Sequence, residues 1–521
     1  MPKLTIDNKK VEVDNGATIL DAAGKLGIEI PTMCFLKGYK ASTSCMLCVV
    51  KVNGSDRLLP ACGTIAQEGM KVETDSDEIR QARKAALELL LSDHAGDCIG
   101  PCQAACPAHM NIPLMIRQIA AGNLRDAIVT IKKDIPLPAV LGRICPKPCE
   151  QVCRRAVFDK AVSICLLKRY VADVDLKADN PYIPKCKKNR NKQVAIVGAG
   201  PAGLAAAYYL QIDGYKCTIF DDHESPGGML RYGVSQDKLP TDVLDAEIAL
   251  IKKLGMVFKG QMPVGCALKM EELLKDFDAV LIATGQTKPD DVESMGLETS
   301  SNGIAINGRT YETNLPGVFA AGAAVRKSKL AVRAVADGKE TAAAIGQFLS
   351  GQPVTGPPHV FNTRIGKLKD GEIEKFMVEA GKAQRITPSP EGSGFTDEQA
   401  RAEAARCLHC DCRKPQNCKL RQYAQQYGAK QGRYKGGRRS FVQHLQHPCL
   451  IYEPGKCINC GLCIQIAAEA GESLGLTFIG RGFDVRVAVP FGRSIAEGLK
   501  FAAEKCVEAC PTGALVFKDK T

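Results

Sequence analysis

The chain has 521 residues, of which 45% are hydrophobic and 24% charged, so it can bury a core and is long enough for about three or four domains. No apolar run approaches the roughly 18 residues that a membrane helix needs, and residues 1–13 lack the profile of a signal peptide, so we expect a cytoplasmic protein. In that reducing compartment, 24 cysteines indicate metal ligation rather than disulfides. The net charge of +12 counts thiols as neutral, and thiolates bound to iron would offset most of it. Because Trp is also absent, we do not expect nucleic-acid binding.

The hydrophobic pattern divides the chain into regions with different secondary structure. Strands are predicted at 3–6, 10–13 and 49–52 and a helix at 19–26, which makes 1–75 a small α+β unit. Helices at 78–91 and 112–132 predict that 76–185 is helical. Strands at 193–197, 216–220 and 278–283 and an Ala-rich helix predict an α/β domain at 186–350. Pro and Gly indicate a linker at 351–395, followed by a helix at 397–406 and two Cys-rich regions, 396–450 and 451–521. The fold class is therefore multidomain, α+β and α/β.

Four cysteines near the amino terminus have the spacing Cys-x10-Cys-x2-Cys-x13-Cys, and they are Cys34, Cys45, Cys48 and Cys62. Gly38, Ser42 and Ser44 make the first loop pliable enough to wrap a compact inorganic core. The arrangement resembles the [2Fe-2S] domain at the front of the large iron-sulfur subunit of respiratory complex I and of many iron hydrogenases. The resemblance implies a ferredoxin-like β-grasp fold with one [2Fe-2S] cluster. Structural zinc and free thiols are the alternatives.

Two further cysteine groups lie on either side of a helical stretch. The first is Cys98-x3-Cys102-x3-Cys106-Pro107, and the second is Cys145-x3-Cys149-x3-Cys153. They look like the amino-terminal domain of the glutamate synthase small subunit and of dihydropyrimidine dehydrogenase. The resemblance implies two [4Fe-4S] clusters, one held by Cys98, Cys102 and Cys153, the other by Cys106, Cys145 and Cys149.

The fourth ligands of these two clusters depart from the family pattern. The family has another cysteine pair where this chain has only Cys98, and we expect His94 to fill the gap. A His-plus-three-Cys cluster also follows the [2Fe-2S] domain of the complex I and hydrogenase subunits. Dihydropyrimidine dehydrogenase takes a non-cysteine ligand from the segment that matches 163–170. Cys165 lies in this segment and is the predicted ligand, since Lys168 and Arg169 are poor ones.

The strand at 193–197 runs into the turn Gly198-x-Gly200-x-x-Gly203, whose backbone can approach a pyrophosphate at the start of a helix. The next predicted strand ends in Asp221, where an acid can bond ribose hydroxyls. The whole order of motifs resembles the FAD domain of the glutamate synthase small subunit, which favours FAD over NAD. The resemblance implies that the cofactor is bound by Gly198, Gly200, Pro201, Ala202, Gly203, Asp221, Gly228, Met229, Leu230, Lys238, Val264, Ala283, Thr284, Gly285, Gly322 and Ala323.

Two features of this region differ from the family. The family inserts a nicotinamide-binding fold between its Ala-Thr-Gly strand and its closing Gly-Val-Phe-Ala-Ala-Gly-Asp segment. Here only residues 286–315 intervene, too few for a βαβ-based domain, so we expect that fold to be deleted. Ala323 stands where the family has an Asp that contacts the flavin, so flavin binding would lose one hydrogen bond, although Gly322 still permits backbone approach.

The carboxy-terminal third contains two more cysteine groups. Cys407, Cys410, Cys412 and Cys418 could hold zinc or a [4Fe-4S] cluster, and the other sites favour iron. Cys457, Cys460 and Cys463 are followed far downstream by Cys510-Pro511. This tail looks like the later ferredoxin-like module of the complex I subunit, which implies one [4Fe-4S] cluster with Cys510 as fourth ligand and Cys506 as the alternative. Cys217, in a predicted strand, is expected to be a buried structural thiol.

Together these motifs predict an electron-transfer subunit of a multi-subunit anaerobic redox enzyme, with one FAD, one [2Fe-2S] and about four [4Fe-4S] clusters. Similar chains accompany formate dehydrogenases, iron hydrogenases and electron-bifurcating NAD(P) or ferredoxin enzymes, so partner redox subunits or ferredoxin are expected. No residue pattern identifies a catalytic residue. The alternatives are a self-sufficient NAD(P)H oxidoreductase, such as a glutamate synthase small subunit, and a non-catalytic cluster-bearing scaffold.

Overall fold

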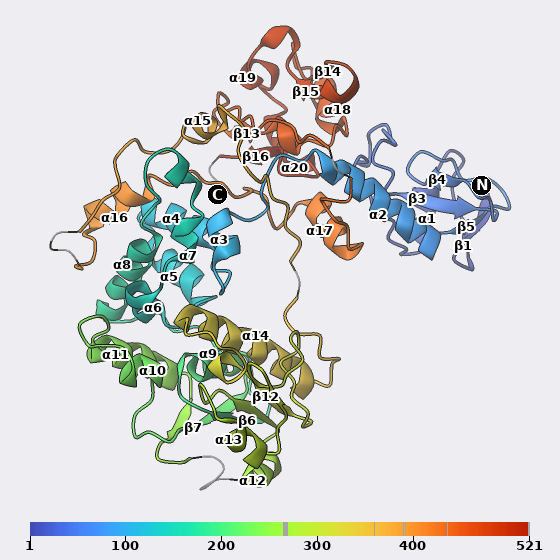
Figure 1. Cartoon of the computed structure of the whole chain (residues 1–521). Helices are drawn as coiled ribbons and strands as arrows, with labels where there is room; N and C mark the ends of the chain where they lie inside the picture. Colours follow the sequence, from blue (N-terminus) through green and yellow to red (C-terminus); the bar gives the residue numbers. More distant parts are fainter. Residues whose placement is uncertain (264–268, 359, 389, 391, 435, 519–521) are drawn as a thin grey trace. The chain divides into compact units, whose positions relative to one another are not determined.

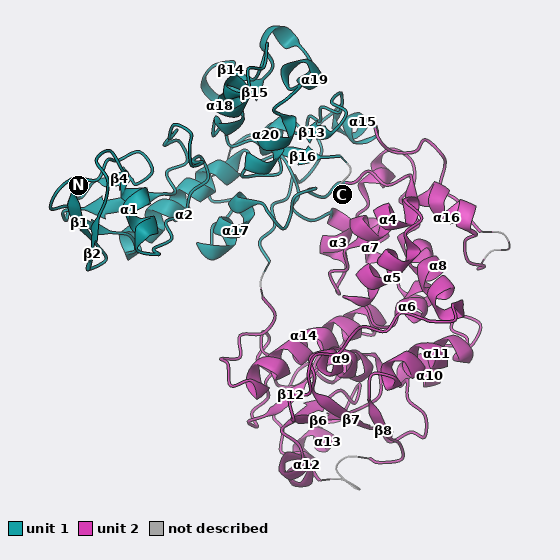
Figure 2. Ribbon diagram, turned by 180° about the vertical axis from the view of Figure 1, so that it is seen from behind, with its two compact units in different colours: residues 1–100, 359–378, 410–521 teal, residues 101–358, 379–409 magenta. Residues whose placement is uncertain are grey.

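The computed structural model describes residues 1–263, 269–358, 360–388, 390, 392–434 and 436–518, and it divides into two compact units (Figures 1 and 2). Unit 1 comprises Met1–Gly100, His359–Val378 and Cys410–Thr521, and unit 2 comprises Pro101–Pro358 and Glu379–His409. The boundary after Gly100 falls inside the region 76–185 that the sequence suggested as one domain.

The amino-terminal part of unit 1 is a five-stranded sheet with the order β2-β1-β5-β3-β4, in which β1 and β5 are parallel. Thr18 and Asp21 form a capping box that begins the helix on this sheet. Ile19 and Ala22 on that helix pack into the same core as Ile6 and Val50. The elements are β1 (Lys3–Ile6), β2 (Lys9–Glu12), α1 (Ile19–Lys25), β3 (Val49–Val52), β4 (Leu58–Pro60) and β5 (Lys71–Glu73).

Helix α2 (Asp77–Ser92) belongs to unit 1 because its buried side chains contact that sheet. The guanidinium of Arg83, which is 3% exposed, donates to the carbonyl oxygens of Val49 at 2.9 Å and Thr74 at 3.0 Å. These bonds offset part of the cost of burying a cation. Farther along α2, Leu87 and Leu91 join the core that surrounds the first cysteine group.

The remainder of unit 1 consists of short elements joined by loops. Strands β13 and β16 form one antiparallel pair and β14 and β15 another. The elements are α15 (Glu372–Phe376), α17 (Lys419–Gln426), β13 (Leu450–Tyr452), η3 (Pro454–Lys456), α18 (Leu462–Glu469), β14 (Thr477–Ile479), η4 (Gly482–Asp484), β15 (Arg486–Ala488), η5 (Pro490–Gly492), α19 (Ile495–Gly498), α20 (Ala503–Ala509) and β16 (Leu515–Phe517).

The first part of unit 2 is helical. The predicted helix 112–132 is two helices, because Gly122 adopts a positive φ of 77° and Asn123 begins a new helix. Helix α16 packs against α4 and α8 of this part. The elements are α3 (Pro101–Ala105), α4 (Ile112–Ala120), α5 (Leu124–Lys132), α6 (Pro138–Ile144), α7 (Pro148–Gln151), η1 (Arg154–Val157), α8 (Ile164–Lys177) and α16 (Asp397–Ala404).

The second part of unit 2 contains a parallel sheet with the order β12-β9-β6-β7-β8. Helices α9 and α14 cross closely, since a Cβ added at Gly338 would overlap the carbonyl oxygen of Ala202. The elements are β6 (Gln193–Val197), α9 (Pro201–Ile212), β7 (Lys216–Phe220), α10 (Met229–Tyr232), α11 (Thr241–Lys252), β8 (Val257–Lys259), α12 (Met270–Asp276), β9 (Ala279–Ile282), α13 (Pro289–Ser294), β10 (Thr299–Ser300), β11 (Gly303–Ile304), β12 (Val318–Ala320), η2 (Gly322–Ala324) and α14 (Ala331–Leu349).

The helical part and the α/β part of unit 2 share one apolar core, to which α9 contributes Ala205 and α14 contributes Val332 and Val335. Polar contacts also join them. The buried carboxylate of Glu247 on α11 accepts from the backbone N–H groups of Ala139 at 2.8 Å and Val140 at 2.9 Å, at the start of α6. The two parts are therefore packed together as one body.

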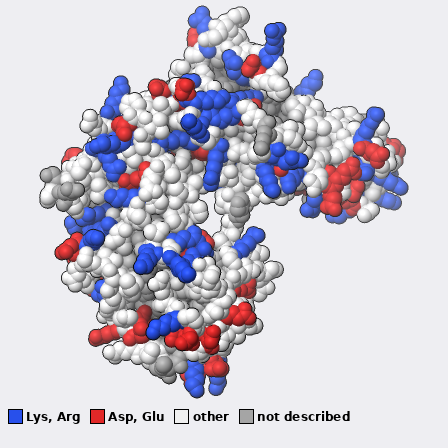
Figure 3. Space-filling model, viewed as in Figure 1, with Lys and Arg blue, Asp and Glu red and all other residues white. Residues whose placement is uncertain are grey.

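Only α13 and the two-residue strands β10 and β11 lie between β9 and β12. This agrees with the expectation that the chain lacks the inserted nicotinamide-binding fold, since such a fold needs parallel strands of its own and β10 and β11 are a two-residue antiparallel pair. Among the described helices, none is long and apolar enough to cross a membrane. On the face drawn in Figure 3, both basic and acidic side chains occur on each unit.

Candidate redox-cofactor sites

The first cysteine group comes together at one end of the amino-terminal sheet. The sulfur atoms of Cys34 and Cys45 are 3.3 Å apart, as are those of Cys48 and Cys62. All four residues are at most 4% exposed. Four buried sulfur atoms in two close pairs fit a [2Fe-2S] cluster, which takes two thiolates on each iron.

Hydrogen bonds among these thiols shift their pKa values in opposite directions. Bonds with Cys45 and Cys62 lower the pKa of Cys34, and the bond with Cys34 raises the pKa of both partners. The hydrogen bond with Cys62 likewise lowers the pKa of Cys48, so each close pair contains one thiol whose thiolate form is favoured. Binding of iron requires the remaining thiols to lose their protons as well.

A second site lies at the start of α18. Cys457, Cys460, Cys463 and Cys510 line one pocket, whose other walls include Tyr452, Ile458, Leu462, Val487 and Leu515. An apolar, water-poor lining of this kind suits a cubane cluster. Cys506 is fully buried, and its thiol donates to the carbonyl oxygen of Cys463 at 3.6 Å. This placement favours Cys510 over Cys506 as the fourth ligand.

A third group of thiols surrounds a buried lysine in unit 2. Burial lowers the pKa of Lys168, but the nearby thiols of Cys165, Cys145, Cys106 and Cys149 raise it above its ordinary value. Cys165 also hydrogen-bonds Cys145 and Cys149. The four sulfur atoms thus share one environment with one cation, which fits a cluster whose four thiolates leave a net charge of about −2.

Lys168 is a functional candidate that the sequence reasoning missed, because that reasoning considered it only as a ligand. Its signal was the spacing: Lys168 follows Cys165 by three residues on α8, so the two side chains lie on the same face of the helix.

Replacing Lys168 by Gln is expected to lower the reduction potential of the cluster predicted at these thiols. Reduction adds negative charge, and a buried ammonium stabilises the reduced form. A shift of about 60 mV corresponds to a tenfold change for one electron, and a shift of this order is expected. The measurement is a redox titration followed by EPR. Lys168→Arg keeps the charge and should stay close to the parent, and an unchanged potential in Lys168→Gln would contradict this role.

The remaining cysteines of the helical region are divided between the two units. Cys102, Cys153 and Cys407 pack, partly buried, against the helical core of unit 2. His94 and Cys98 belong to unit 1, as do Cys410, Cys412 and Cys418. The predicted trio Cys98, Cys102 and Cys153 stays a prediction, as does the quartet from Cys407 to Cys418.

The glycine turn after β6 has the geometry that a dinucleotide needs. Cβ atoms added at Gly198 or Gly203 would overlap backbone oxygens, whereas one added at Gly200 meets nothing within 4 Å. Helix α9 begins at Pro201, and Gly200 before it provides no side-chain cap, so the N–H groups that follow the proline in the first turn are available to a pyrophosphate. A Cβ added at Gly228, which has a φ of 50°, would come within 2.8 Å of the Gly200 Cα, so this second glycine also permits a close approach of backbone at the turn.

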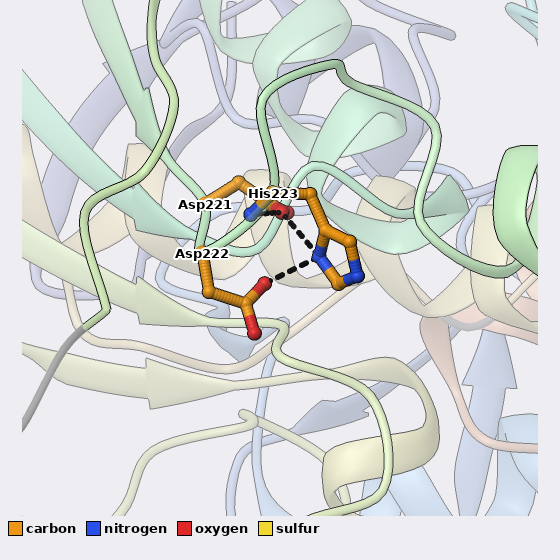
Figure 4. Close-up of side chains that lie close together, drawn as sticks. All are labelled: Asp221, Asp222 and His223. Atoms are coloured by element: carbon orange, nitrogen blue, oxygen red, sulfur yellow. Dashed lines mark hydrogen bonds and ion pairs between the residues drawn. The ribbon is translucent and has the colours of Figure 1, made fainter.

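Asp221 directly follows strand β7 near this turn, and Figure 4 shows it beside Asp222 and His223. Its carboxylate accepts from the N–H of Ala199 at 2.6 Å and from the N–H of His223 at 2.9 Å. Although burial lowers the pKa of His223, its hydrogen bonds to Asp222 and Asp221 raise it overall. The imidazole also stacks on Tyr232, with ring centroids 4.2 Å apart. Asp221 is therefore held in place next to the glycine turn.

The other predicted flavin contacts lie on loops and helix starts around the same sheet. Met229 and Leu230 begin α10, exposed Lys238 precedes α11, and Ala283, Thr284 and Gly285 follow β9. Gly322 and Ala323 form the 3₁₀ turn η2 after β12, where a Cβ on Gly322 would come within 2.9 Å of the Ala202 side chain. Val264 lies outside the described residues. Cys217 is 2% exposed in β7 and burial raises its pKa, which confirms its prediction as a buried thiol.

Family models match most of the amino-terminal two thirds of the chain. A 2Fe-2S iron-sulfur cluster binding domain matches residues 2–77, and domain II of dihydropyrimidine dehydrogenase, a 4Fe-4S cluster domain, matches 78–180. An NAD(P)-binding Rossmann-like domain matches 196–253, and a pyridine nucleotide-disulphide oxidoreductase domain matches 259–338.

Relatives with these domains are subunits of redox enzymes. The beta subunit of NADP(+)-dependent formate dehydrogenase from Moorella thermoacetica is 38% identical over 240 residues, 42% of this chain and 32% of the relative. The beta subunit of NADPH-Fe(3+) oxidoreductase from Geobacter sulfurreducens is 42% identical over 209 residues, 39% of this chain and 30% of the relative. The small chain of NADPH glutamate synthase from Bacillus subtilis is 34% identical over 212 residues, 40% of this chain and 43% of the relative. The matched part thus spans less than half of each of these relatives.

A solved NAD+-reducing [NiFe]-hydrogenase chain aligns with 99% of this chain and 88% of its own length, at 12% identity and a TM-score of 0.36. At that score the likeness carries no further conclusion.

The matches confirm the predicted domain types: a ferredoxin-like [2Fe-2S] domain, a helical 4Fe-4S domain and a Rossmann-like nucleotide-binding domain. The predicted class, an oxidoreductase chain built from iron-sulfur and nucleotide-binding domains, is therefore confirmed.

Proposed function

We propose that the chain is an electron-transfer subunit of a cytoplasmic, multi-subunit redox enzyme, and that it carries one FAD, one [2Fe-2S] cluster and about four [4Fe-4S] clusters. The observation that carries the proposal is the assembly of buried thiols from distant parts of the sequence. Cys145 meets Cys165 in unit 2, and Cys510 meets Cys457 across one pocket in unit 1. Disulfide formation does not explain groups of four converging thiols, whereas ligation of iron does.

The flavin part of the proposal depends on the surroundings of Gly200. The open space at this glycine and the uncapped start of α9 provide backbone donors for a diphosphate. Gly203 and Gly198 hold the turn close to the sheet, and Asp221 is fixed beside it. Bound there, a flavin would exchange two electrons at once or one at a time, and clusters carry one each.

The need for a partner subunit is inferred from the number of dinucleotide folds in the α/β part. The segment between β9 and β12 holds α13 and a two-residue hairpin, so the described residues provide one dinucleotide fold. We infer that the hydride donor or acceptor binds to another subunit, as in a hetero-oligomeric complex of the formate dehydrogenase, hydrogenase or bifurcating type. The named relatives are themselves subunits, which supports this proposal.

The proposal is tested by purifying the full chain without oxygen and measuring iron, acid-labile sulfide and FAD per chain. About eighteen irons, two from one [2Fe-2S] and four from each of four [4Fe-4S] clusters, and one FAD are expected. Clusters without flavin would support the scaffold alternative, to which Ala323 gives some weight. A zinc-containing protein without sulfide would contradict the proposal.

A further inference from the structure

Three segments of unit 1 that are far apart in sequence run side by side around Cys98. Asp97 pairs with Asp411 in a parallel bridge, so the residues that follow, Cys98 and Cys412, are neighbours in register. On the other side, the N–H of Cys98 donates to the carbonyl oxygen of Thr363 at 3.4 Å. This arrangement brings one cysteine of the first helical group next to a cysteine more than 300 residues away in the sequence.

Cys418 joins the same pair of thiols. The N–H of Lys419, the residue after Cys418, donates to the carbonyl oxygen of Pro511 at 2.8 Å, and the sulfur of Cys412 lies against Gly513, two residues farther along. The segments that carry Cys412 and Cys418 therefore pack against the same loop. The three residues are 7% to 8% exposed, so the thiols meet inside the protein.

Backbone N–H groups stabilise the thiolate forms of these cysteines. Thr363 donates to Cys98 at 3.4 Å, and the N–H groups of Lys414 and Arg421 lower the pKa values of Cys412 and Cys418. The pocket at α18 also contains a backbone hydrogen bond to sulfur, since the N–H of Asn459 donates to the sulfur of Cys457 at 3.4 Å. Such bonds favour the thiolate, which is the form that binds metal.

The surroundings provide both space and a compensating charge. A Cβ added at Gly513 would overlap the sulfur of Cys412, so this glycine makes room for it. Lys456, which is 3% exposed, lies against Gly96 and lowers the pKa of Cys412. Its ammonium also pairs with Glu453 at 2.5 Å. A buried cation thus lies near Cys412, as Lys168 lies near its thiols in unit 2, but here a buried carboxylate shares the charge.

We propose that Cys98, Cys412 and Cys418 ligate one iron-sulfur cluster of unit 1, with His94 as the fourth ligand. His94 is 9% exposed, the N–H of the next residue, Ala95, donates to the carbonyl oxygen of Gly455 at 2.9 Å, and the Lys456 side chain lies against Gly96, so this segment runs beside Lys456. The inference rests on the proposed iron-sulfur function. It changes two groupings expected from the sequence, in which Cys98 joined Cys102 and Cys153, and Cys412 and Cys418 joined Cys407 and Cys410.

The position of this cluster gives it a role in electron transfer. One apolar core of unit 1 contains Cys418 together with Cys34 and Cys45 of the first site and Cys460 of the pocket at α18. The three sites of unit 1 are therefore packed in contact with one core. A cluster at Cys418 would therefore share this core with the [2Fe-2S] site and with the carboxy-terminal site, and it would be placed to exchange electrons with either.

The grouping is tested with Cys98→Ala, Cys412→Ala and Cys102→Ala in the full chain, together with the Cys98→Ala/Cys412→Ala double variant. Iron content and EPR spectra of the dithionite-reduced proteins are compared. Cys98→Ala and Cys412→Ala should lose the same signal and up to about four irons, the double variant should lose no more than either, and Cys102→Ala should lose a different signal. If Cys98→Ala and Cys102→Ala lose the same signal and Cys412→Ala another, the inference is wrong.

Two controls separate the possible failures. Exposed Cys449 lies in unit 1, so Cys449→Ala should change no signal. The [2Fe-2S] signal reports that unit 1 is folded, because Cys34 and Cys418 share a core, and any alanine variant that loses this signal is replaced by the serine variant. A parent chain without iron would refute the proposed function, whereas a fully loaded parent whose double variant loses two clusters would refute only this grouping.

Discussion

Replacement of Gly200 by Ala is expected to empty the flavin site while leaving the fold intact. Gly200 has a φ of −75° and an added Cβ meets no atom within 4 Å, so alanine fits the apo protein. The methyl group would occupy the space through which a pyrophosphate approaches the start of α9. We expect FAD affinity to fall at least tenfold, which is about 1.4 kcal/mol.

The measurement is FAD per chain after purification and the dissociation constant for added FAD. Gly346→Ala is the matched control, because Gly346 lies within α14 and an added Cβ would make an ordinary contact of 3.8 Å with Tyr215. Alanine there should keep FAD and stabilise the helix by about 0.5–1 kcal/mol. Full flavin content in Gly200→Ala would show that the cofactor does not approach this turn.

Cys165→Ala is expected to remove or degrade one [4Fe-4S] cluster. Cys165 hydrogen-bonds Cys145 and Cys149 and shares Lys168 with Cys106, so its loss leaves three thiols for four irons. If the cluster is degraded, the protein should lose about one iron and keep a three-iron cluster that is visible by EPR in the oxidised state. If the whole cluster is lost, about four irons should be missing.

The control for Cys165→Ala is Cys217→Ala, since both cysteines are 2% exposed in unit 2. The Cys217 thiol lies 4.0 Å from the carbonyl oxygen of Ala207 and 3.9 Å from that of Tyr215. The Cys217→Ala variant should therefore be somewhat less stable than the parent, and its iron content should be unchanged. Equal iron and unchanged spectra in Cys165→Ala would show that another residue completes this cluster.

The sequence predicts the local parts of this molecule well, for reasons that are physical. The strand 193–197 and the turn at Gly198 are set by β-branched residues and by contacts that only glycine permits, and the structure has them at the expected positions. The helix break at Gly122 was missed because the apolar pattern continues with helical spacing on both sides.

The grouping of distant cysteines was harder to predict. Short spacings such as Cys457-x2-Cys460 identify thiols that meet within one turn. The neighbours of Cys98 and Cys165, however, are decided by tertiary packing. The bridge between Asp97 and Asp411 has no signal in the local sequence. The burial of the cation Lys456 also has no signal in the local sequence. A lysine is expected at the surface, and only the structure shows that Lys456 is buried against Gly96.

The central claim is that this chain passes electrons through flavin and clusters but receives them from a partner subunit. An anaerobic titration of the isolated full chain with NADH and NADPH, with flavin and cluster absorbance recorded, tests it most directly. We expect dithionite to bleach the protein and neither nucleotide to do so at a comparable rate. Rapid bleaching by either nucleotide would contradict the claim and identify the chain as a self-sufficient NAD(P)H oxidoreductase.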